Sequence, residues 1–229
     1  MEKTEQETPR TAQEPYFISF LNRIGGVFLA PDSTFTQIVT QRISILEPLM
    51  LIILLVGIEA ALIASFAYRI FSAFTTAFSS VTGTAPLGFL AFIPWIMLTM
   101  MIVSILISWL ILAGIAHISA KYVFKGSGSY IGLLKLYGYA FIPYSLMILS
   151  TILIGISWVT WPIALFLNII MTFWIIILMT AAVKQNYGVD TGKAFISSFI
   201  GPMLLWLIIV GIFWAWIWLI TSSFMGGMM

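Results

Sequence analysis

Five long apolar segments, separated by short polar stretches, dominate the chain after its first 46 residues. Each approaches or exceeds the roughly 20 apolar residues that a helix needs to cross a hydrocarbon layer of about 30 Å. The pattern therefore predicts an all-α polytopic membrane protein, whose five-span helical bundle occupies 47–221 and is followed by a short outer tail at 222–229. The spans are expected near 48–70, 90–115, 136–157, 161–182 and 197–220.

The segment before the first span has a different pattern. Residues 1–15 are polar and contain two prolines, so they cannot bury enough apolar surface to offset chain entropy, and we expect a disordered cytoplasmic tail. Residues 16–46 carry apolar side chains at helical spacing, which predicts two short amphipathic helices separated at Pro31. On the first helix, Ser19 and Arg23 fall opposite the apolar stripe. Such helices commonly lie in the headgroup plane, and a soluble hairpin packed on itself is the alternative.

The basic residues predict the orientation of the bundle. Nine of the 10 Lys and Arg residues lie before the first span or in the segments after the second and fourth spans, whereas Arg69 alone lies on the other side. The positive-inside rule then predicts a cytoplasmic N-terminus and an outer C-terminus in the plasma membrane. Tryptophan rings prefer the membrane interface, and six of them fall near the predicted outer boundary: Trp95, Trp158, Trp161, Trp214, Trp216 and Trp218.

Composition excludes several classes of protein. Only 8% of the residues are charged and 61% are hydrophobic, whereas soluble domains have about 25% charged residues, so the chain is not a water-soluble globule. Cysteine is absent, which excludes disulfides, thiolate metal sites and cysteine-linked lipid anchors. The single histidine, His117, excludes a multi-histidine metal centre. The net charge of +2 gives no indication of nucleic acid binding, and we expect none.

Known catalytic motifs do not occur in the sequence. One histidine cannot form an HExxH helix, and the glycine-rich stretch 126–129 is not followed by Gly-Lys-Ser/Thr. Tyr187-Gly188-Val189-Asp190 falls short of the Gly-x-Gly-Asp motif of intramembrane aspartyl proteases, because Tyr187 and Val189 occupy its two glycine positions. We therefore expect no catalytic residue, cofactor or metal, and the sequence predicts that the protein is not an enzyme.

Glu59 lies at the midpoint of the first predicted span. An ionised side chain at this depth costs about 3 kcal/mol on insertion scales, so such a residue is a candidate functional group. Because no Lys or Arg lies at a matching depth, burial favours the uncharged carboxyl form. Depth counting along the helices predicts Ser104 and Asn168 as hydrogen-bond partners. Two roles stay open, a packing hydrogen bond between helices and a proton or cation relay.

The third predicted span opens with a short motif, Gly138-Tyr139 followed by Pro143. The proline removes one backbone N–H and clashes with the carbonyl of Tyr139, which predicts a kink one turn into the span. Gly138 allows another helix to approach closely, and the tyrosine offers an amphipathic ring near the interface. Gly138, Tyr139 and Pro143 are therefore candidate contact residues.

These residues resemble the Gly-Tyr-x-x-x-Pro signature of the Yip family, the Ypt/Rab-interacting membrane proteins, in its prokaryotic branch. The stretch 28–35 is similar to the amphipathic lead-in of prokaryotic members, and 183–202 is similar to their connector into the last span. Five spans with a cytoplasmic N-terminus are also the architecture of this family. The Asp-Leu-x-Gly-Pro element of eukaryotic members is reduced here to Leu46-Glu47-Pro48, whose last two residues are juxtamembrane candidates.

The resemblance implies a non-catalytic membrane scaffold or adaptor that organises the bilayer or partner proteins. In eukaryotic relatives the implied role is vesicle trafficking with small GTPases. The expected partners are the lipid bilayer and either other proteins or further copies of the chain. The alternative function is a small proton- or cation-coupled transporter or channel centred on Glu59, and measurement of flux in reconstituted vesicles would separate the two.

Overall fold

The computed structural model describes residues 15–41, 43–82 and 92–226. Almost all of the predicted N-terminal tail therefore lies outside the described residues, as does the end of the predicted outer tail. Within the described ranges every regular element is a helix, which confirms the all-α prediction.

Five helical segments are long and apolar enough to cross a membrane, as the sequence predicted. The third consists of two helices, and π-helical turns follow α4 and precede α9. The segments are formed by α3 (Leu46–Thr82), α4 (Ile93–Ile118) with Ser119–Val123, α5 (Tyr130–Ala140) with α6 (Tyr144–Ile156), α7 (Trp161–Tyr187), and α8 (Thr191–Phe195) with Ile196–Ile200 and α9 (Gly201–Gly226).

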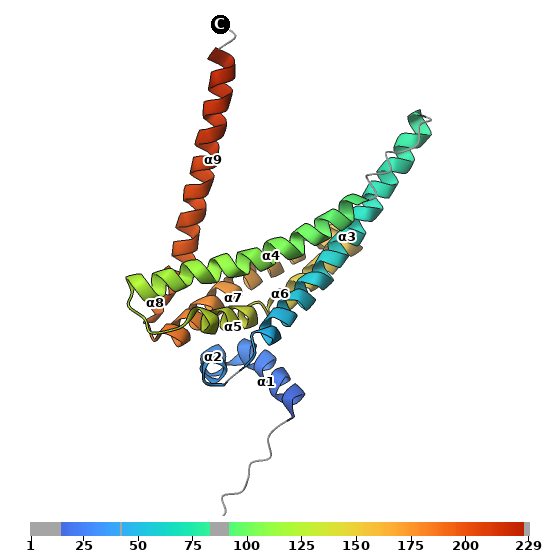
Figure 1. Cartoon of the computed structure of the whole chain (residues 1–229). Helices are drawn as coiled ribbons and strands as arrows, with labels where there is room; N and C mark the ends of the chain where they lie inside the picture. The colour runs from blue at the N-terminus through green and yellow to red at the C-terminus, as the bar shows by residue number, and fades with distance from the viewer. Residues whose placement is uncertain (1–14, 42, 83–91, 227–229) are drawn as a thin grey trace, which may run out of the picture.

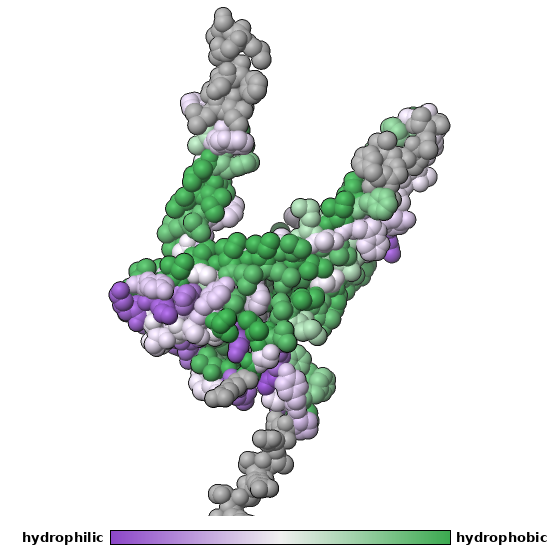
Figure 2. All heavy atoms as spheres, in the orientation of Figure 1, coloured by the Kyte–Doolittle hydropathy of each residue, from purple (hydrophilic) through white to green (hydrophobic). Residues whose placement is uncertain are grey.

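The described spans pack tightly only over part of their length. α3 packs along α4 and α6, while α7 packs on α5 and α6. The best-buried large side chains gather on α2, α5 and α7, at the end of the bundle that also holds α8, and include Tyr137, Tyr139, Tyr187, Phe35, Leu133 and Leu136. Figure 2 shows apolar side chains along the bundle and hydrophilic ones gathered around α8.

Two shorter helices lie against this end of the bundle (Figure 1), α1 (Tyr16–Leu29) and α2 (Pro31–Thr40). They contact each other, and α2 also packs on α5 and α7. Asp32 of α2 accepts a hydrogen bond from Gln185 at 2.7 Å and lies 3.5 Å from the Lys184 ammonium. The amphipathic helices therefore pack both on each other and on the bundle.

Two helices extend away from the packed region (Figure 1). α3 has 37 residues, so at a rise of 1.5 Å per residue it is about 55 Å long, and its outer part projects beyond its neighbours. α9 contacts the preceding π-helical turn and α4, and most of its described apolar side chains are exposed. In a bilayer these surfaces meet lipid.

Candidate functional site

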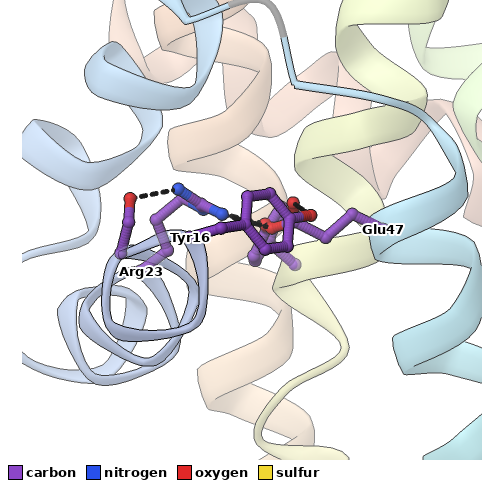
Figure 3. A network of polar contacts seen from close by, with 5 residues as sticks. Tyr16, Arg23 and Glu47 are labelled. Atoms are coloured by element: carbon purple, nitrogen blue, oxygen red, sulfur yellow. Dashed lines mark hydrogen bonds and ion pairs between the residues drawn. The ribbon is translucent and has the colours of Figure 1, made fainter. Parts of the chain in front are cut away.

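A buried ion pair joins α1 to the first turn of α3 (Figure 3). The Arg23 guanidinium contacts one oxygen of Glu47, with Nη2–Oε1 at 2.7 Å and Nε–Oε1 at 3.1 Å. The side chains of Arg23 and Glu47 are only 3% and 6% exposed. Because isolated charges are very unfavourable in such surroundings, each ion requires the other and further hydrogen bonds.

Tyr139 of α5 connects this ion pair to the third span. Its hydroxyl accepts a hydrogen bond from Arg23 Nε at 3.0 Å and donates one to Glu47 Oε1. The Tyr139 side chain is fully buried. One tyrosine thus contacts both members of the ion pair. Its bond to Arg23 joins residues that are 116 positions apart in the chain.

Two polar side chains of α1 complete the network. Ser19 Oγ accepts a hydrogen bond from Arg23 Nη1 at 2.7 Å, and the Tyr16 hydroxyl donates one to Glu47. The bond to the carboxylate raises the pKa of the Tyr16 phenol above its usual value, so this group stays protonated and donates at neutral pH. We call Tyr16, Ser19, Arg23, Glu47 and Tyr139 the α1 anchor.

Local sequence explains why the anchor forms at this place. Glu47 lies in the first turn of α3, where unpaired N–H groups and the helix dipole favour a carboxylate. Pro48 follows it in the turn, where a helix tolerates proline. Gly138 of α5 faces this proline so closely that a Cβ on the glycine would overlap the Pro48 Cβ. The glycine thereby lets α5 approach and places Tyr139 beside Glu47.

Pro143 lies at a break in the third span. The sequence predicted a kink, whereas the structure has a turn over 141–143 between α5 and α6. Pro143 has no backbone N–H to donate to the Tyr139 carbonyl. That carbonyl instead accepts a hydrogen bond from the Ile142 N–H at 3.0 Å. Four of the candidates therefore lie together: Glu47, Pro48, Gly138 and Tyr139. Pro143 lies in the break that follows α5, the helix of Gly138 and Tyr139.

Comparison with protein families gives an assignment for most of the chain. The model of the Yip1 domain matches residues 25–215. The chain belongs to the Yip1 family. Glu47, Pro48, Gly138 and Tyr139 all lie within the matched region, and the resemblance of the chain to this family is thereby confirmed.

A similar relative of this Yip1-domain chain is an uncharacterised protein of Methanocaldococcus jannaschii. The two are 32% identical over 116 residues, which cover 49% of this chain and 74% of the relative. No solved structure matches the chain.

The sequence did not identify the three α1 members of the anchor, of which Arg23 is the charged one. It lies before the Yip1 match begins, and its helical phase suggested a solvated face. The structure keeps this residue on the same face as Ser19 but buries it against Glu47, so this part of the polar face packs on α3 instead of facing solvent. Tyr16, Ser19 and Arg23 share one face of α1 by their spacing, which was the one available signal.

Glu59 is buried within the Yip1 bundle, but its predicted partners were wrong. Its Oε1 atom accepts a hydrogen bond from Thr151 of α6 at 3.3 Å. Ser104 is exposed and bonds to the carbonyl of Met101 in its own helix at 2.9 Å. Asn168 donates to Ser150 Oγ at 2.5 Å. Counting residues along a helix predicts how deep a side chain lies in the membrane, but it does not predict which neighbouring helix that side chain faces.

Replacement of Glu59 tests whether it serves as an uncharged hydrogen-bonding group. Glu59→Gln keeps the size and a carbonyl acceptor for Thr151, so we expect unchanged thermal stability of the purified protein in detergent. Glu59→Lys places an unpaired cation within the span and should cost about 3 kcal/mol. A Lys variant as stable as the wild type would contradict this role.

Proposed function

We propose that this Yip1-domain protein is a non-catalytic integral membrane scaffold or adaptor, which organises the bilayer or partner proteins. The α1 anchor supports this proposal. Its charged and hydroxyl groups bond to one another, so they hold α1 on the spans and are engaged in structural contacts. Such an arrangement builds a fixed surface from α1 and α2, and a fixed surface suits recognition.

We further propose that this surface faces the cytoplasm at the plasma membrane. The ion pair of Lys184 with Asp32 keeps the basic end of α7 beside α2. Lys121 lies in the π-helical turn after α4 and Lys125 in the loop that follows it, and this loop joins the same end, because the Ser127 N–H donates to the Tyr187 carbonyl at 3.2 Å. Basic residues on one side of the bundle favour a cytoplasmic location for that side.

Reporter fusions test this orientation. With five crossings and a cytoplasmic N-terminus, a reporter fused after Met229 lies outside the cell. We expect a fluorescent protein that matures only in the cytoplasm to be dark there, and a phosphatase that requires the periplasm to be active. The reverse pattern would contradict the orientation, and the same reporters fused before Met1 provide the control.

Co-purification tests the scaffold function. We expect the tagged full-length protein, extracted from its native membranes in lipid discs, to retain specific proteins identified by mass spectrometry. Tyr139→Phe removes only the hydroxyl that joins α1 to α5, so it should reduce this retention. Glu59→Gln is the matched control, since it changes a polar group away from α1 and should leave retention unchanged.

Two results would contradict the scaffold proposal. The first is a set of retained proteins no different from that of an unrelated five-span protein extracted in the same way. The second is proton-coupled uptake into vesicles that contain the purified protein, if Glu59→Gln abolishes this uptake.

A further inference from the structure

A cleft separates α1 from the first turns of α3. Its volume is about 770 Å³, and it is lined mainly by apolar side chains. Phe20 and Ile24 of α1 form one wall, Met50 and Leu54 of α3 form another, and Ile142 lies on the α5–α6 turn. The volume falls within the roughly 300–1,000 Å³ typical of small-molecule sites.

The polar side chains that line this cleft, apart from Ser145, are already engaged. Glu47 and Tyr16 belong to its lining, and both are members of the α1 anchor. The carboxylate bonds to Arg23 and to two tyrosine hydroxyls, so it is neutralised and needs no further partner. The Ser44 hydroxyl accepts the N–H of Leu46 at 3.2 Å. The occupant that fits such a lining is therefore apolar and carries no cation.

The cleft is continuous with the surface that meets the bilayer. Met50 and Leu54 line the cleft, yet they are 68% and 63% exposed on a helix of membrane-spanning length. The opening therefore runs from the level of α1 along the spanning helix. A hydrocarbon chain can enter sideways from the bilayer without crossing water, and this continuity identifies the source of the occupant.

We propose that the cleft binds one acyl chain of a bilayer phospholipid. A bound peptide would require partners for its backbone N–H and C=O groups, and the lining offers few unengaged polar atoms. An acyl chain has no such requirement and gains from burial of its methylene groups. Binding of phospholipid is measured without any protein partner, so either proposal can fail without the other.

Native mass spectrometry of the full-length protein tests the site. The probe is phosphatidylcholine, added in small molar excess to protein stripped of lipid in detergent. We expect one bound phospholipid per chain for the wild type. Ile24→Trp and Leu54→Trp each place a larger side chain in the cleft. If this excludes two methylene groups of the acyl chain, phospholipid binding weakens about tenfold.

Matched controls use the same substitution on the same helices. Leu21→Trp and Ile53→Trp change exposed apolar residues that do not line the cleft, so they should retain phospholipid as the wild type does. Equal loss in all four variants, or no loss in the filling variants, would overturn the proposal. Retention of a free fatty acid, a peptide or a second copy of the chain in place of phospholipid would overturn it as well.

A second measurement does not depend on the folding of any variant. Wild-type protein is irradiated with phosphatidylcholine that carries a diazirine at the end of one acyl chain, under the same lipid-poor conditions. We expect labelled peptides to come from α1 and the start of α3. Labelling spread equally over the exposed faces of α7 and α9 would show that lipid contacts are not confined to the cleft, and it would overturn the proposal.

Discussion

Arg23→Ala should destabilise the protein by about 3–5 kcal/mol, the cost of removing one partner from a buried ion pair. The substitution leaves the Glu47 carboxylate in a site where it is only 6% exposed. It also removes the donor that bonds to Tyr139 and Ser19. Arg23→Lys should recover part of the loss, since an ammonium carries the charge but lacks the planar fork of the guanidinium. Thermal and dodecyl sulfate unfolding in detergent measure these differences.

A surface arginine and a double variant serve as controls. Arg69→Ala changes an exposed residue on the same helix as Glu47, so its effect should stay within about 0.5 kcal/mol. The combination of Arg23→Met with Glu47→Leu replaces both charges by apolar groups and should recover most of the stability lost in Arg23→Ala. If the double variant loses as much as its two single variants together, the residues do not act as a pair.

Gly138→Leu should cost about 1–3 kcal/mol through overpacking. A Cβ at this position overlaps Pro48, and both atoms belong to packed helices that have little room to separate. Because the approach of α5 to α3 also positions Tyr139, we expect the substitution to loosen the α1 anchor. Limited proteolysis within α1, compared with thermal unfolding of the same preparation, measures both effects.

Alanine substitutions at two glycines isolate the cause. Gly138→Ala adds the single carbon that meets Pro48, whereas Gly57→Ala adds it where, apart from the adjoining backbone of its own helix, no atom lies within 4 Å. Alanine has the higher helix propensity by up to about 1 kcal/mol, so Gly57→Ala should be neutral or stabilising. A stabilising effect at both positions would show that Pro48 does not restrict the space at Gly138.

Sequence patterns were sufficient for the spans and for part of the site. Apolar runs long enough to cross a bilayer have few alternatives, which is why the number of spanning segments was predictable. Gly138 and Tyr139 were identified from local chemistry and motif, and Glu47 and Pro48 from the resemblance to the family. Their contact was not, because the distance between positions 47 and 139 in space depends on how α3 and α5 pack.

Arg23 and Glu59 show two different reasons for failure. A charged residue on an amphipathic helix is ordinarily solvated and is buried only when it is paired, so Arg23 could be assigned correctly only with knowledge of Glu47 beside it. For Glu59 the depth in the membrane was readable, but the choice between Thr151, Ser104 and Asn168 required the rotation of three helices about their axes.

The separation of Arg23 and Tyr139 along the chain has a consequence for biosynthesis. The separation of 116 positions takes about 6–23 s to translate at roughly 5–20 residues per second. During this time the guanidinium lacks its bond to Tyr139 and α1 has no third span to dock on, so its apolar face rests on the membrane surface. α1 therefore docks late in synthesis, only after the first and third spans have inserted and packed against each other.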